Sequence, residues 1–288
     1  MAIKNKKVLL GKCVLYIIEI FLALIFLFPF YTMIVKSLMG AEEYWSPTLR
    51  LFPNKIVWDN YVEAFSASGA MENGMPYMIQ YLLNTLKICL LATVGLLLSA
   101  SFCAFGFTKI KFPGRDLVFA ITLATTMIPG SVMIVPLYSL YSRFHWINTH
   151  YPMWVGMWFG GGAANIFLVM QYMKRLPKEL TESASIDGAN IFRQYFQIIL
   201  PNCVPILAVL AIGAIIGPWN DIQTPLLYLE SQENYTLALG VSELRTMAEV
   251  EMPVILAACT MMTLLPLVAF IFNQKFFVES VVTSGVKG

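Results

Sequence analysis

The chain alternates long apolar runs with short polar connections. A run of about 20 apolar residues is the length that an α-helix needs to cross the hydrocarbon core of a bilayer. Six such segments follow one another along the sequence, at about 13–35, 78–107, 117–142, 152–173, 204–222 and 252–274. The pattern predicts an all-α integral membrane fold with six transmembrane helices. We expect one transmembrane domain over residues 1–288, with its core at about 78–276.

Composition supports the membrane class and excludes others. The 288 residues are 58% hydrophobic and only 12% charged, whereas a soluble domain carries roughly 25% charged residues. The net charge of +2 is too small to indicate a nucleic-acid partner. The five cysteines lack the spacing of metal ligands, and the two histidines, His145 and His150, lie in one polar connection. We therefore expect no metal site.

The distribution of lysine and arginine predicts the orientation, because positive residues are retained on the cytoplasmic side. With the N-terminus inside, the cytoplasmic side receives 13 of the 19, namely Lys4, Lys6, Lys7, Lys12, Lys109, Lys111, Arg115, Lys174, Arg175, Lys178, Arg193, Lys275 and Lys287. Both termini and the loop at about 174–203 are then cytoplasmic. The connection at about 36–77 is external, and its pieces "WDNYVEAF" and "MPYMIQYLLN" could each start a short amphipathic helix.

The loop at about 174–203, between the fourth and fifth segments, is rich in charged and small residues. A helix is expected to start near Pro177, and Leu180, Ala184 and Gly188 would then share one face that narrows along the helix. Such a face fits a groove of another protein, with Glu182 and Asp187 beside the seam. A helix lying on the membrane surface is the alternative, although its acidic character favours a protein partner.

Two residues predict where a second helix of this loop begins and ends. Asn190 can cap a following helix through "IFRQYFQII". Pro201 is expected to end that helix and turn the chain towards the membrane.

At these residues the chain resembles the permeases of bacterial ABC importers, whose cytoplasmic EAA loop has a fixed pattern. The matching positions are Glu182, Ala184, Gly188, Ile198, Leu200 and Pro201, and Ser183 replaces the usual alanine. The resemblance implies that these residues, with Asp187, couple the chain to ATPase subunits.

The resemblance extends over about residues 13–288 and narrows the class. "KFPGRD", "TMIPGSVMIVPLY", "GPWNDIQTPLLYL" and "KFFVESVVTSGVKG" are similar to carbohydrate permeases related to the maltose permease subunits, specifically the smaller six-span partner. It implies a multi-pass protein of the bacterial cell membrane that imports a sugar or oligosaccharide. The implied partners are a second permease subunit, two ATPase subunits that bind ATP and Mg, and an external solute-binding protein. The chain itself has no Walker motif, so neither catalytic residues nor a cofactor is expected in it.

Other classes need features that the sequence carries weakly. An ion-driven secondary transporter usually keeps ionisable groups near the midplane, and only Glu19, Lys87 and Asp221 qualify. An intramembrane enzyme would need a constellation of His, Asp or Ser within the spans, which contain no histidine.

Candidates for the substrate path are Trp219, Asn220 and Asp221, which close the fifth segment, together with Asn84 and Asn165. An aromatic plane beside hydrogen-bonding groups suits a sugar. Buried asparagines can instead hold helices together across a bundle. "GGGAAN", residues 160–165, is expected to be a close-packing or flexible element.

Overall fold

The computed structural model describes residues 2–48 and 50–285, and this part of the chain is helical with irregular connections and one isolated β-bridge between Ala70 and Pro76. The long helices are α1 (Ala2–Ser37), α4 (Tyr77–Lys109), α12 (Val204–Asn220) and α15 (Met252–Gly285). Those of intermediate length are α3 (Asp59–Ser66), α5 (Arg115–Ala124), α6 (Gly130–Arg143), α8 (Ala163–Met173), α9 (Glu179–Ile186) and α14 (Leu237–Leu244). Shorter pieces are α2 (Ala41–Tyr44), η1 (Thr125–Met127), α7 (Tyr151–Trp154), η2 (Val155–Trp158), α10 (Ile191–Gln194), η3 (Tyr195–Ile199), α11 (Leu200–Asn202), α13 (Gln223–Tyr228) and η4 (Gln232–Asn234). The predicted all-α fold is confirmed.

The structure divides into two compact units. One contains the chain up to Gly69 together with Glu243–Thr263, and the other contains Ala70–Ser242 together with the residues from Leu264 onward. Both candidate sites predicted from the sequence, the loop 174–203 and the substrate path, lie in the second unit.

In the first unit, polar groups of α3 satisfy the carbonyls at the end of α1. The side-chain amide of Asn60 donates to the carbonyl oxygens of Ser37 and Met39, each at 2.8 Å. The hydroxyls of Tyr61 and Ser37 lie 2.8 Å apart. The last carbonyls of a helix lack partners within the helix, so α3 gives this end of α1 a defined cap. The predicted short helix in "WDNYVEAF" is thus confirmed as α3.

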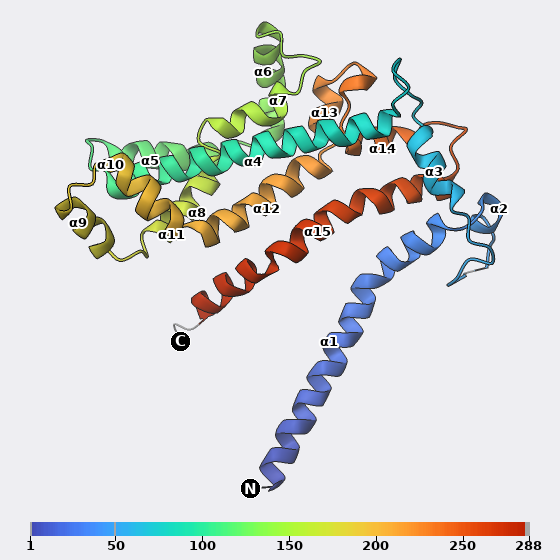
Figure 1. Ribbon diagram of the computed structural model, residues 1–288, viewed down its shortest axis with the longest axis horizontal. Coiled ribbons are helices and arrows are strands. Elements are labelled where there is room, and N and C mark those ends of the chain that lie inside the picture. Colours follow the sequence, from blue (N-terminus) through green and yellow to red (C-terminus); the bar gives the residue numbers. More distant parts are fainter. Residues whose placement is uncertain (1, 49, 286–288) are drawn as a thin grey trace. The chain divides into compact units, whose positions relative to one another are not determined.

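In the second unit, α4 is the central helix and packs against α8, α12 and η2 (Figure 1). Small residues of α4, including Ala100 and Ala104, are fully buried, which lets neighbouring helices approach closely. The piece "MPYMIQYLLN" does not form a separate interfacial helix, because Tyr77 begins α4 itself. Starting the helix there satisfies backbone groups that a separate short helix would leave open.

The count of six membrane-crossing helices stays a prediction. Among the described residues, three helices are long and apolar enough to span a bilayer by themselves, Gly11–Ser37, Tyr77–Lys109 and Tyr151–Met173, or up to five if each of two bent pairs is one span. In the sixth segment, the apolar part of α15 that meets this test covers Met252–Val268 and is shorter than the three spans.

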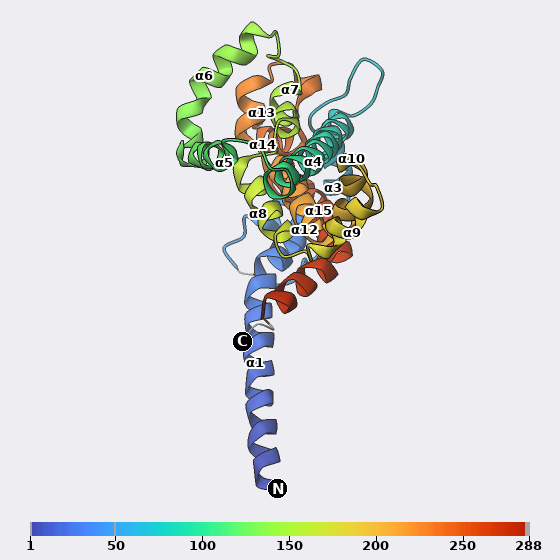
Figure 2. The ribbon, with the colours of Figure 1, turned by 90° about the vertical axis from the view of Figure 1, so that its left-hand side faces the viewer.

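The third apolar segment is broken rather than straight. Arg115–Met127 and Gly130–Arg143 meet at an angle of 100°. Pro129 causes the break: it lacks an N–H, and it disfavours helical backbone in the residue before it. Ile128 accordingly is extended, with φ −77° and ψ 116°. Figure 2 shows α6 turning away from α5 at this point.

The glycines at 160–162 allow close packing, as predicted. All three have positive φ, a conformation that glycine adopts without steric cost. A Cβ on Gly161 would lie 3.2 Å from the backbone of Leu96 in α4, so this turn runs directly against the central helix.

Candidate functional site

Two features make up the candidate site: the loop 174–203 and a cavity beside α12. In the loop, α9 begins at Glu179, two residues after Pro177, with Lys178 as its N-cap. Glu179 and Glu182 lie in the first turn of α9, where negative charge interacts favourably with the helix dipole. Both side chains are exposed.

The face of α9 differs from the one expected. Ala184 is only 6% exposed, so it packs inside the chain instead of offering a small face to a partner. Gly188 lies beyond the last helical residue. Most of α9 is exposed, and Ile186 has 86% of its surface exposed; the exposed residues are Glu179, Leu180, Glu182, Ser183, Ser185 and Ile186. Of the three residues expected on the small face, Leu180 and Gly188 are exposed, and only Ala184 is turned into the loop.

Gly188 ends α9 in a Schellman motif. Its N–H donates to Ser185 O at 3.1 Å, and the N–H of Ala189 donates to Ala184 O at 2.9 Å. This motif needs a left-handed residue at the position of Gly188, and its φ is +75°. A Cβ there would meet nothing within 4 Å in this chain. The glycine is therefore required by the backbone and not by a tight contact inside the subunit.

The second half of the loop is tied to the first by side chains. Asn190 caps α10, as predicted, with its Oδ1 accepting from Arg193 N at 2.8 Å. Gln194 donates to Ala189 O at 2.9 Å and to Ser185 Oγ at 3.1 Å. Since Ser185 belongs to α9, Gln194 joins the two halves of the loop.

A π-helical turn, η3, anchors the loop to α4. Tyr195 is 1% exposed, and its hydroxyl lies 2.7 Å from Ser101 Oγ. The Ser101 hydroxyl donates to Leu97 O within α4, so Tyr195 is the donor between the two hydroxyls. The Tyr195 ring also packs on Phe102 and Phe105 of α4, at centroid distances of 5.3 and 5.2 Å.

The anchor residues differ from those that the sequence pattern emphasised. Ile198 and Leu200 are half-buried and Pro201 is exposed, whereas Ile199 and Cys203 are fully buried beside Tyr195 in the core. The spacing of Tyr195, Ile199 and Cys203, each four residues apart, was the signal for this buried face.

The chain turns at Cys203, not at Pro201. Helical structure continues through Pro201 to Asn202, because proline is tolerated in the first turn of a helix, here α11. The helical run Ile191–Asn202 then meets Val204–Asn220 at 76°. The helix therefore ends one residue after Pro201, at Asn202, and the turn comes at Cys203.

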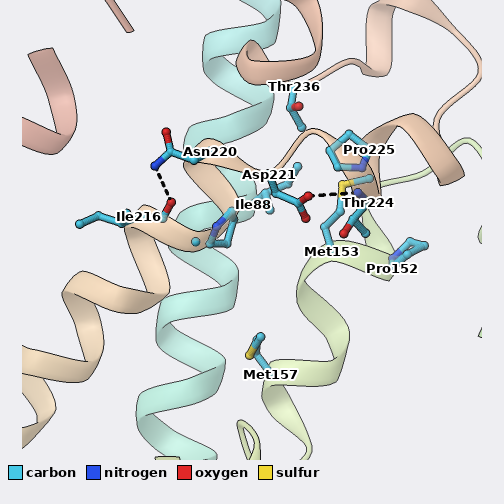
Figure 3. A pocket seen from close by; sticks show the side chains of 12 residues that line it. Ile88, Pro152, Met153, Met157, Ile216, Asn220, Asp221, Thr224, Pro225 and Thr236 are labelled. Carbon is cyan, nitrogen blue, oxygen red and sulfur yellow. Dashed lines mark hydrogen bonds between the residues drawn. The ribbon is translucent and has the colours of Figure 1, made fainter. Parts of the chain in front are cut away.

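The second feature is a cavity of about 690 Å³ beside α12, which we call the Asn220 cavity (Figure 3). Its walls come from α4, α7, η2, α12, α13 and the segment before α14, and they are mostly apolar. Asn220 and Asp221 supply polar groups. Both residues form local hydrogen bonds: Asn220 donates to Ile216 O at 3.0 Å, and Asp221 Oδ1 accepts from Thr224 N at 3.1 Å.

The other residues proposed for the substrate path lie elsewhere in the second unit. Trp219 is 1% exposed and does not line the Asn220 cavity. Asn84 is buried and donates to the carbonyl oxygens of Glu233 and Tyr235, at 2.8 and 3.0 Å, and so holds a connecting loop against α4. Asn165 lines a neighbouring cavity of about 340 Å³ and donates to Gly161 O at 2.6 Å.

Comparison with known proteins identifies the family. Residues 96–283 match the model of the "binding-protein-dependent transport system inner membrane component". The chain belongs to this family, and it is therefore a membrane protein, as its composition predicts.

Curated relatives match over nearly their whole length. The galactooligosaccharides transport system permease protein GanQ of Bacillus subtilis is 30% identical over 95% of this chain and 94% of its own. The arabinooligosaccharides transport system permease protein AraQ of Bacillus subtilis is 29% identical, covering 93% of this chain and 92% of its own. The maltose/maltodextrin transport system permease protein MalG of Escherichia coli is 27% identical, covering 91% of each.

The fold is also that of a solved transporter. A chain from the crystal structure of a bacterial ABC transporter involved in the import of the acidic polysaccharide alginate superposes with a TM-score of 0.79 at 19% identity, covering 93% of this chain and 96% of that chain. This likeness supports the ABC permease fold.

Proposed function

We propose that this chain is a permease subunit of a bacterial ABC importer that takes up a neutral sugar or oligosaccharide. ATPase subunits, which bind ATP and Mg, dock on the loop 174–203, and an external binding protein delivers the substrate. The chain contributes part of the pore and no chemistry of its own. The relatives named as oligosaccharide permeases support the substrate class.

One observation carries the proposal: the loop has an exposed tip and a buried root. The tip presents Ile186 and the acidic groups of Glu182 and Asp187 to a partner. The root is Tyr195, which bonds to Ser101 of α4. Because Ile88 of the same helix lines the Asn220 cavity, a force on the tip reaches the helix that borders the cavity. Movement of this kind is a familiar way to convert a docking event into a conformational change.

Exposed apolar surface supports the presence of a second permease subunit. α5 and α6 contain no buried residue although they are largely apolar. In α1, the side chains from Gly11 to Phe30 are also exposed. Lipid can cover part of this surface. A partner subunit against α6 would bring a second set of helices to the pore.

The Asn220 cavity is the proposed place for substrate within this subunit. Apolar walls with a few polar groups are typical of small-molecule sites. Asn220 offers an amide oxygen, and Asp221 offers a second carboxylate oxygen, for sugar hydroxyls.

The experiment is uptake by the complete importer in vesicles, with the two permease subunits, the ATPase subunits and the binding protein. We expect uptake of labelled maltotriose, arabinotriose or galactotriose that requires ATP and persists when an ionophore removes the proton gradient. Uptake that needs the gradient and ignores ATP would replace the proposal with an ion-driven secondary transporter. Absence of ATPase in the purified complex would remove the docking role of the loop.

A further inference from the structure

A second cavity lies between α6, α7 and α13 and has the chemistry of a sugar site. Its volume is about 470 Å³, within the range of roughly 300–1,000 Å³ found for small-molecule sites. Figure 2 shows these three elements at one end of the second unit. We call it the Tyr228 cavity. It shares Pro152 and Thr224 with the Asn220 cavity, so the two cavities are neighbours.

Four side chains of the Tyr228 cavity carry polar groups that are available to a ligand. Tyr228 is only 4% exposed. Its hydroxyl, the hydroxyls of Ser131 and Tyr141 and the carboxamide of Gln223 make no hydrogen bond within the part of the chain that the structure describes. Groups without a hydrogen bond inside the chain are available to bond a ligand. A ligand with several hydroxyl groups of its own would meet them at several positions at once.

The ring of Tyr228 is held in place by its neighbours. It stacks on Tyr138, with centroids 5.9 Å apart and an interplanar angle of 14°, and it meets Tyr141 edge-on at 5.4 Å. Its backbone carbonyl accepts from Asn148 N at 2.7 Å. A binding group that is already fixed loses little freedom when a ligand arrives, which favours affinity.

The lining also indicates which ligand fits. Tyrosine rings can pack against the C–H faces of a pyranose or furanose, while hydroxyl and amide groups bond to its hydroxyls. Among the described residues, those that line the cavity are Gly, Ser, Ile, Leu, Tyr, Pro, Gln and Thr, and none of them is charged. A uronate would bring a carboxylate into this environment without a cation to pair with, which is unfavourable.

We infer that the Tyr228 cavity is a subsite for one neutral sugar unit, adjacent to the Asn220 cavity, and that Tyr228 and Gln223 are its principal contacts. The inference rests on the proposed function, because it assigns a second binding site to the same substrate. A ligand of two or three units could occupy both cavities in turn or together.

The test measures shielding of the cavity by sugar in the assembled importer. Leu137 lines the cavity on α6 and carries no polar group, so Leu137→Cys is the probe. Leu140, also on α6, is exposed and does not line the cavity, so Leu140→Cys is the matched control. Both are placed in a chain whose own cysteines are replaced, at Cys13, Cys89, Cys103, Cys203 and Cys259. A membrane-impermeant methanethiosulfonate reagent then reports the rate of modification.

We expect maltotriose, arabinotriose or galactotriose, whichever is transported, to slow modification of Leu137→Cys at least 5-fold and to leave Leu140→Cys unchanged. A uronate trisaccharide should protect neither. Adding Tyr228→Phe should raise the sugar concentration for half-protection about 5- to 10-fold, the effect of one lost hydrogen bond. Tyr151→Phe should not change it, since Tyr151 does not line the cavity.

Two results overturn the inference. Equal protection at positions 137 and 140 would indicate movement of α6 instead of occupancy. Unchanged half-protection in Tyr228→Phe, with normal uptake, would remove the subsite while the proposed function stands. A wild-type importer that takes up none of the three neutral sugars would instead overturn the proposed function, and the subsite with it.

Discussion

Removing the hydroxyl of Tyr195 is expected to loosen the loop 174–203 from α4 without unfolding either element. Tyr195→Phe keeps the ring contacts with Phe102 and Phe105 and loses only the hydrogen bond of 2.7 Å to Ser101. Ser101 still donates to Leu97 O, so no buried donor is left without a partner. The cost is then that of one net hydrogen bond, about 1 kcal/mol.

The reverse variant should cost more. Ser101→Ala leaves the Tyr195 hydroxyl buried without its acceptor, at about 1–3 kcal/mol. Tyr195→Ala removes the ring and opens a cavity, for which about 3–5 kcal/mol is typical. The expected order of destabilisation is therefore Tyr195→Phe, then Ser101→Ala, then Tyr195→Ala. Thermal denaturation of the detergent-purified importer measures this order.

The functional result should be uncoupling. A loss of about 1 kcal/mol lowers the ratio of anchored to released loop about 5-fold. ATP hydrolysis stimulated by the binding protein should then continue, while sugar transported per ATP falls by up to about this factor. Tyr172→Phe is the matched control, because this half-buried tyrosine packs against the same core and its hydroxyl makes no hydrogen bond within the described residues.

The reasoning fails on either of two outcomes. In a double-mutant cycle, Tyr195→Phe and Ser101→Ala should show a coupling energy of about 1 kcal/mol; strictly additive effects would mean that the two hydroxyls do not interact. A Tyr195→Phe importer with the wild-type ratio of sugar to ATP would show that the anchor does not transmit force.

Three further predictions follow from single residues. Gly188→Asn should be nearly tolerated, whereas Gly188→Val should weaken co-purification of the ATPase about 5- to 30-fold. The reason is that the left-handed backbone at this position costs an L residue about 1–2 kcal/mol. Equal effects of the two substitutions would contradict the backbone explanation. Gly240→Ala should lower thermal stability by about 1–3 kcal/mol, since its Cβ would lie 2.2 Å from the buried ring of Tyr81, and a neutral result would refute that packing. Burial lowers the pKa of His150, whose Nε2 donates to Asn234 O at 2.9 Å. Its neutral form is favoured in the folded state, so stability is present above pH of about 6.5 and is lost as the pH falls towards the lowered pKa. Melting temperatures at pH 7.5 and 5.0 should therefore converge in His150→Gln, and an unchanged pH dependence would refute this role.

The sequence determined the features that depend on near neighbours. Apolar runs predict helices, and Asn190 caps the helix that follows it, because each of these effects acts within about four residues. The pattern of small and charged residues around Glu182 also carried the resemblance to the permeases of ABC importers, the class that the family match supports. The break before α6 also has a local cause, Pro129, although the sequence analysis did not predict it.

Only the tertiary structure decided which side chains are free to act. Tyr195 meets Ser101 across 94 positions of the chain, and Asn84 meets Glu233 across 149; no local pattern specifies such pairs. Ala184 has the small side chain of a docking face, yet the loop folds over it. Tyr228 and Gln223 were part of a stretch similar to carbohydrate permeases, but the sequence did not single them out as site residues. They line a cavity because α6 turns at Pro129 and packs beside α13. Burial and partnership depend on the path of the whole chain, and for that reason they could not be deduced from spacing.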